Sequence, residues 1–133
     1  MTTHASGAFD VTMSPQAMHD TAATTTLARM ALAKRYHGDL DATGAGEMIA
    51  AGTSVKGSAG YVAMERVEGA LHGRTGSFVL QHSGTMDRGT PTLWVTVVPD
   101  SGTGELLGLA GKLVIEIVEG KHFYAFDYTL GEA

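Results

Sequence analysis

Residues 113–130, LVIEIVEGKHFYAFDYTL, are typical of two β-strands joined by a tight turn. The first half is a run of large apolar residues. In the second half every other residue is aromatic or histidine: His122, Tyr124, Phe126 and Tyr128. A period of two places alternate side chains on one face of a strand. Between the halves, Glu119-Gly120 suits the type I′ turn of a hairpin, so we predict an antiparallel hairpin here.

Similar segments extend back toward the N-terminus. Strand-like patterns, most of them bounded by glycine, occupy residues 5–13, 59–68, 74–84, 93–98 and 105–118. About eight strands with short loops predict an all-β fold with an antiparallel sheet. Closure into an eight-stranded barrel would remove the exposed edges, while a two-sheet sandwich is the alternative. Residues 14–24 resemble a connection, and residues 27–35 consist of strong helix formers that only neighbouring strands would hold extended.

Composition limits the class of protein. The 133 residues are enough for a single domain over residues 1–133, and the absence of cysteine excludes disulfides and thiolate metal sites. A net charge of −5, with no basic run longer than Lys34-Arg35, argues against nucleic-acid binding. No phosphate-binding, dinucleotide or zinc-binding spacing is present, so we expect no metal and no cofactor. Because neither a signal peptide nor a membrane-length apolar run is visible, we expect a cytoplasmic protein with no membrane partner.

Several polar side chains share strand faces with large apolar ones. They are Glu65, Arg74, His82, Glu105 and His122, together with the aromatic residues Trp94 and Tyr124 and, on the opposite face of residues 74–84, Gln81. Alternate residues of a small barrel point inward, so these faces would place carboxylates, imidazoles and an arginine in an apolar lumen. Such groups either orient a polar ligand or act as acid and base. Taken singly, each residue also fits a structural role, as a solvated strand face, a salt bridge, core packing or a rim position.

Three segments resemble a known family. They are GRTGSFVLQHSGT at residues 73–85, VVPDSGTGELLGLAG at residues 97–111, and GKHFY at residues 120–124. Together they are similar to a family of small bacterial proteins of unknown function. The resemblance, which covers residues 7–130, implies an eight-stranded barrel of the allene oxide cyclase-like, calycin-like type. It also implies that residues 25–37 form a strand, and it supplies no activity.

Three functions are therefore considered. The first is binding of a small apolar or amphipathic molecule in the lumen by Arg74, Gln81, His82, Trp94, His122 and Tyr124. The second is a cofactor-independent cyclase or isomerase with Glu65 or Glu105 as acid or base. The third is a structural module that forms a homo-oligomer through outward strand faces such as Leu113, Ile115 and Ile117. We rank ligand binding above catalysis, and both above a purely structural role.

Overall fold

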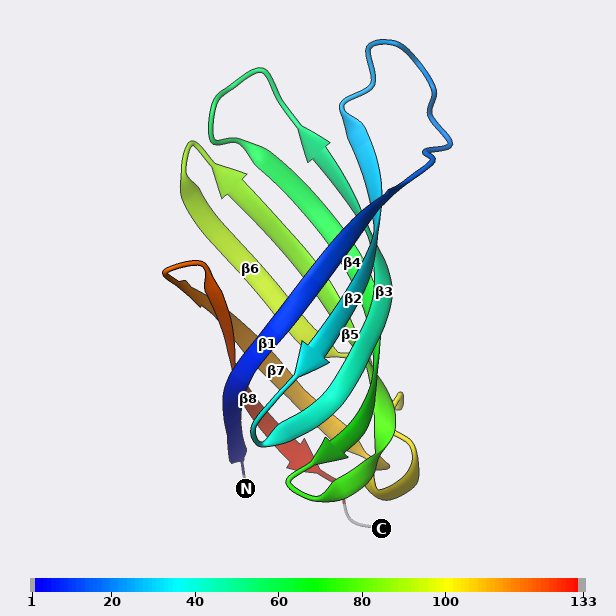
Figure 1. Ribbon diagram of the computed structural model, residues 1–133, viewed down its shortest axis with the longest axis vertical. Coiled ribbons are helices and arrows are strands. Elements are labelled where there is room, and N and C mark those ends of the chain that lie inside the picture. The colour runs from blue at the N-terminus through cyan, green and yellow to red at the C-terminus, as the bar shows by residue number, and fades with distance from the viewer. Residues whose placement is uncertain (1, 132–133) are drawn as a thin grey trace.

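Eight strands follow one another around a closed antiparallel barrel (Figure 1). They are β1 (Thr3–Gln16), β2 (Leu27–Tyr36), β3 (Leu40–Gly52), β4 (Ala59–Leu71), β5 (Arg74–Asp87), β6 (Thr90–Val97), β7 (Leu109–Val118) and β8 (Lys121–Leu130). The computed structural model describes residues 2–131, and β8 pairs with β1 to close the sheet. The predicted all-β, eight-stranded antiparallel barrel is confirmed.

Helical structure is minor in this chain. Within the described residues the helical element is a short 3-10 helix, η1 (Gly104–Leu106), between β6 and β7. None of residues 2–131 belongs to a helix with the length and hydrophobicity needed to cross a bilayer.

Strand β2 contains the helix-forming residues 27–35, and its neighbours hold it extended. Lys34 lies opposite Val11 of β1 and opposite Gly44 of β3. Because both edges of β2 are paired, the ladder hydrogen bonds override the local helix propensity. The strand implied by the family resemblance is confirmed.

Three of the hairpin turns share one design. Each consists of a non-glycine residue followed by glycine, both at positive φ: His72-Gly73, Arg88-Gly89 and Glu119-Gly120. Positive φ at both central residues is the requirement of a type I′ turn, whose twist matches that of the strands. The turn predicted at Glu119-Gly120 is confirmed, with φ angles of 51° and 79°.

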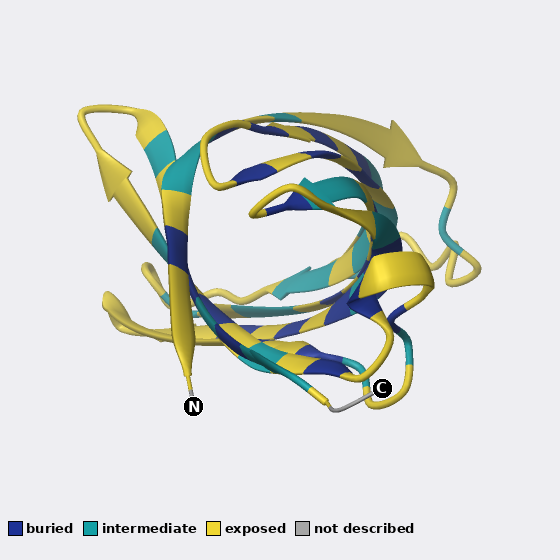
Figure 2. Cartoon of the chain, turned by 90° about the horizontal axis from the view of Figure 1, so that it is seen from below, coloured by how far each residue is buried: buried dark blue, intermediate teal, exposed yellow. Residues whose placement is uncertain are grey.

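The end of the barrel near both termini is solid. Buried and exposed residues alternate along its strands (Figure 2). The buried side chains pack together in one hydrophobic cluster. Phe78 and Phe126 stack there with ring centroids 5.9 Å apart. The Tyr124 hydroxyl donates to the His37 carbonyl at 2.6 Å and accepts from the Leu40 amide at 2.8 Å, which fixes the β2–β3 turn. This half supplies the hydrophobic core of the fold.

The sheet is weakly closed along one seam. Strands β4 and β5 pair from Ala59↔Met86 to Leu71↔Arg74, whereas the recorded pairing of β6 with β7 is Thr96↔Lys112. Beyond that pair the β7–β8 hairpin stands away from β6 (Figure 1). The upper half of the barrel is therefore more open than the half with the termini.

Candidate functional site

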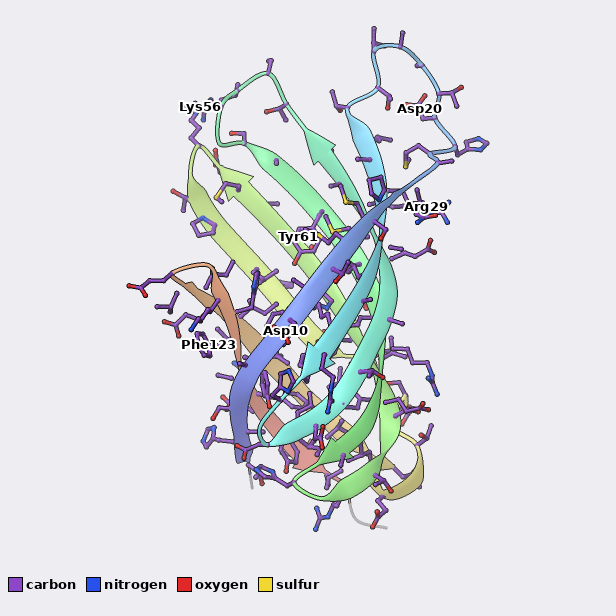
Figure 3. The ribbon with its side chains drawn as sticks, in the orientation of Figure 1. Asp10, Asp20, Arg29, Lys56, Tyr61 and Phe123 are labelled. Carbon is purple, nitrogen blue, oxygen red and sulfur yellow. The ribbon has the colours of Figure 1, made fainter. Side chains whose placement is uncertain are left out.

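A cavity of about 520 Å³ occupies the open half of the barrel. Its walls are mostly apolar side chains from β1, β2, β3, β4, β6 and β7: Val11, Met13, Leu32, Met48, Tyr61, Leu93, Ile115 and Ile117. Tyr61, labelled in Figure 3, belongs to the upper part of β4. Among the polar side chains that line the cavity, Lys34 and His82 lie beside the buried Glu65.

Glu65 is the centre of a buried network below this cavity. Glu65 is completely buried, with 0% of its surface exposed. The Lys34 ammonium donates a hydrogen bond to its Oε1 atom at 2.9 Å. The Nε2 atom of His82 lies 2.9 Å from the same oxygen, and the Tyr36 hydroxyl donates to Oε2. Strand alternation brings these four side chains inward, because all of them occupy the buried phase of β2, β4 and β5.

The network keeps the Glu65 carboxylate ionised. Burial alone would raise the pKa of Glu65. The hydrogen bond from His82, the charge of Lys34 and the bonds from Tyr36 and Lys34 outweigh burial and hold that pKa below its ordinary value of 4.5. Burial first, and then the Glu65 charge, raise the pKa of Tyr36, so its hydroxyl remains a donor. Glu65 therefore holds Lys34 and His82 in place, and it is not itself among the residues that line the cavity.

Three polar groups remain available at the cavity surface. Within residues 2–131, every enclosed side-chain nitrogen or oxygen has a hydrogen-bond partner. His82 Nδ1 and the Tyr61 hydroxyl have no recorded partner, so both must border open space, and the cavity is the space that these residues line. Lys34 uses one of its three N–H donors on Glu65 and lies 5.1 Å from the centre of the Phe9 ring. The cavity therefore presents N–H and O–H donors and the Nδ1 atom of His82 within mostly apolar walls.

Comparison with known proteins places the chain in a family. A family model for proteins of unknown function, DUF3224, matches residues 5–128. The chain belongs to the DUF3224 family. No curated protein matches it. A crystal structure of a DUF3224 protein of unknown function from Shewanella oneidensis MR-1 is 49% identical, with a TM-score of 0.95 and complete coverage of both chains. The predicted membership of a family of unknown function is confirmed, and functional inference for this DUF3224 protein must start from its geometry.

Three of the predicted site residues lie where the sequence placed them. Glu65 and His82 face the lumen of the DUF3224 barrel, and His82 is 3% exposed. His122 lines the cavity near its rim, with its ring centroid 5.2 Å from that of Phe9. The inward placement expected for these residues is confirmed, and their roles stay predictions.

Three others lie outside the cavity. Glu105 is exposed on η1 and accepts hydrogen bonds from the Thr75 amide and hydroxyl, both at 3.0 Å, and these bonds lower the pKa of Glu105. Arg74 is exposed at the start of β5, and Tyr124 is buried in the solid half. Their expected place in a hollow lumen is wrong, because the chain turns into η1 before Glu105 and because that end of the barrel is filled.

The inward and outward faces of β6 and β7 also differ from the prediction. Trp94 is 70% exposed on the outer surface, because Val95 and Val97 take the inward phase of β6. Gln81 is exposed on the outer face of β5, opposite His82 as the alternation predicts, so the predicted role of Gln81 in binding a lumen ligand is wrong. Of the three β7 residues expected on an exposed outer face, Leu113 is buried and Ile115 is partly buried and lines the cavity. Ile117 lines the cavity at its rim and is 62% exposed.

Sequence reasoning missed Lys34, Tyr36 and the role of Tyr61 as a wall residue. Leu32, Lys34 and Tyr36 have the period-two spacing of an inward strand face, but the surrounding helix formers hid it. Within residues 2–131, no group of three or more His, Asp or Glu side chains is arranged to hold a metal ion. The polar centre of the DUF3224 lumen is a lysine–glutamate–histidine–tyrosine network.

Proposed function

We propose that this protein binds a small, largely apolar molecule with a hydrogen-bond-accepting oxygen in the open half of its lumen. The observation that supports this proposal is the apolar cavity of about 520 Å³ above Lys34 and His82. Ligand sites in proteins measure roughly 300–1,000 Å³ and combine apolar walls with a few placed polar groups. The cavity has both properties.

The polar groups determine how such a molecule would lie. Its apolar part would contact residues such as Leu32 and Ile115, which would remove hydrocarbon surface from water. Its oxygen would accept from Lys34 or from the Tyr61 hydroxyl. Because Glu65 fixes the Lys34 ammonium at 2.9 Å, this donor is already in place before the ligand arrives.

A pair of variants of β3 tests the proposal. Ala50 lines the cavity and Ala45 is exposed on the outer face of the same strand. Ala50→Phe should fill the cavity and Ala45→Phe should leave it open. With anilinonaphthalene sulfonate as the probe, we expect saturable fluorescence enhancement for the wild type and Ala45→Phe, and its loss for Ala50→Phe. Equal binding by all three proteins would contradict lumen binding.

The geometry disfavours catalysis by the two carboxylates. A cyclase or isomerase that used Glu65 as acid or base would have to disrupt a buried network of three hydrogen bonds, and Glu65 is fully buried and does not line the cavity. Glu105 is exposed and bonded to Thr75. A cofactor-independent reaction would therefore depend on other groups of the cavity.

Self-association is the second candidate function, and the outer surface supports it. An exposed row crosses four strands, because Ile49 pairs with Val62, Val62 with Ser83, and Ser83 with Trp94. Three of its four members are large and apolar, and such a patch typically marks an interface. A second copy of the chain could cover it. Light scattering should then show a dimer for the wild type and a monomer for Trp94→Lys, and a wild-type monomer at every concentration would contradict the idea.

A further inference from the structure

We propose that His82 is a general base that moves a proton between carbon atoms beside a carbonyl group, which would make the protein an isomerase of small apolar ketones and enones. The inference rests on the proposed binding of an apolar molecule in the lumen and adds a reaction to it. It differs from catalysis by the lumen carboxylates, because Glu65 acts here only through His82.

The bond between His82 and Glu65 sets the form of the imidazole. An ionised carboxylate can only accept a hydrogen bond, so Nε2, 2.9 Å from Oε1, has the hydrogen. In the neutral ring the lone pair is then on Nδ1, which borders the cavity and has no recorded partner. A carboxylate that orients an imidazole in this way is the arrangement found behind histidine bases in many enzymes. Glu65 is therefore a positioning residue, and His82 is the catalytic residue.

A positive charge lies beside this base. Lys34 Nζ and His82 Nε2 are both 2.9 Å from Glu65 Oε1, so the ammonium and the imidazole share one corner of the cavity floor. Lys34 has N–H donors left over, and the ring centroid of Tyr61 is 6.5 Å from that of His82. Donors fixed in a dry site stabilise the negative charge that develops on an oxygen. A carbonyl oxygen held by Lys34 or Tyr61 would thus have its α-carbon near a base.

The reaction needs no further reagent. His82 Nδ1 takes a proton from the carbon next to the carbonyl, and the C–H electron pair forms a new carbon–carbon double bond. The carbonyl π pair moves to oxygen, which Lys34 and Tyr61 stabilise as an enolate. The Nδ1–H then returns the proton to the opposite face of the same carbon, which inverts a stereogenic centre, or, in an unsaturated ketone, to the far end of the conjugated system. The histidine is regenerated and the product is an isomer of the substrate.

Exchange in heavy water measures the first half of this reaction directly. Acetophenone and cyclooctanone would be incubated with the protein, and proton NMR would follow loss of the α-proton signal. Saturation-transfer NMR on the same samples would report binding separately. We expect His82→Gln, whose amide can still donate to Glu65, to bind both ketones and to lose exchange by roughly 10²-fold or more, the usual contribution of a general base.

Two further variants make the result specific. His37→Gln is the matched control, because His37 Nε2 also lies 3.0 Å from a carboxylate, that of Asp10, in an exposed pair, and it should exchange at the wild-type rate. Tyr61→Phe should fold normally and still bind, because Lys34 remains as a donor to the ligand oxygen, but it should exchange more slowly. This variant keeps the test open if His82→Gln fails to fold.

Each outcome decides one question. Wild-type binding without exchange, or exchange equal in wild type and His82→Gln, would overturn the proposed base and leave lumen binding intact. Ketones that do not bind would overturn the proposed isomerase, while the fluorescent probe with Ala50→Phe and Ala45→Phe decides lumen binding separately.

Discussion

At the scale of single residues, Gly44 determines where the buried acid lies. A Cβ atom at this position would stand 2.2 Å from Oε2 of Glu65, far closer than a non-bonded contact allows, so the carboxylate would have to move. Because glycine leaves that space empty, the carboxylate extends toward β3 and meets Lys34 and Tyr36 of the next strand. The network therefore depends on a residue that contributes no functional group.

Gly44→Ala should displace the carboxylate and weaken its bonds. Overpacking a filled interior costs about 1–3 kcal/mol, and we expect a loss of that size in the free energy of unfolding, measured by urea denaturation. Gly52→Ala on the same strand is the control, since its Cβ would meet nothing within 4 Å. A Gly44→Ala protein as stable as Gly52→Ala would show that the network tolerates the change.

Acid should destabilise the protein through Glu65. Its pKa in the folded state is below the ordinary 4.5, so the folded state binds this proton less readily than the unfolded chain. The stabilisation from this group is complete above pH 4.5 and is lost as the pH falls from there through the folded-state pKa. Urea denaturation as a function of pH should show this loss in the wild type. In Glu65→Gln the acid-dependent loss should be smaller, and identical slopes would assign it to other carboxyl groups.

At the scale of elements, three hairpins depend on non-glycine residues in a left-handed conformation. Arg88 and Glu119 have φ angles of 46° and 51°, a region that asparagine tolerates better than most residues. Each turn adds only two residues between its strands, so the turn conformation also fixes the strand register.

Replacing these residues should stabilise the barrel. We expect Arg88→Asn and Glu119→Asn each to raise the free energy of unfolding by about 0.5 kcal/mol, because the native turn conformation is less strained. Gly120→Ala, at a φ of 79°, should lower it by about 1 kcal/mol. Thermal denaturation of the three variants checks these signs. A destabilised Glu119→Asn would mean that the Glu119 side chain makes a contribution of its own.

Strands and turns were predictable where the pattern was unambiguous. Alternation around Phe78 and Leu80 placed His82 inward correctly, and Glu65 followed from its spacing to Tyr61. Residues 93–98 are almost continuously apolar, so no pattern distinguished the faces of β6, and Trp94 was placed on the wrong one. The inward face of β2 was hidden because helix propensity is local, whereas the pairing that overrides it is not.

At the scale of the whole molecule, the barrel is held unevenly around its circumference. Strand β4 pairs along most of its length with both neighbours, while the recorded pairing between β6 and β7 is Thr96↔Lys112. Backbone groups beyond that pair lack a ladder partner on one side. Because Leu93 of β6 and Ile117 of β7 line the cavity, the seam is also a lateral route to it.

Hydrogen exchange should reveal this seam. Peptides from residues 90–95 and 114–118 should exchange faster than a peptide from residues 61–67, because local opening is easiest where strand pairing is incomplete. The folded protein would be labelled in heavy water and then digested, and mass spectrometry of the peptides would give the exchange of each segment. Uniform protection of all three segments would show that the seam is closed in solution.

The barrel has a solid half and a hollow half, so the residues that maintain the fold are largely separate from those that shape the cavity. Substitutions around Phe78 and Phe126 threaten folding, whereas substitutions on the wall of the cavity alter mainly its shape and chemistry. The wall of the cavity can therefore be changed while the core around Phe78 and Phe126 is kept. For protein engineers, residues on the cavity wall can be replaced to change the shape and chemistry of the cavity with little effect on the core of the barrel.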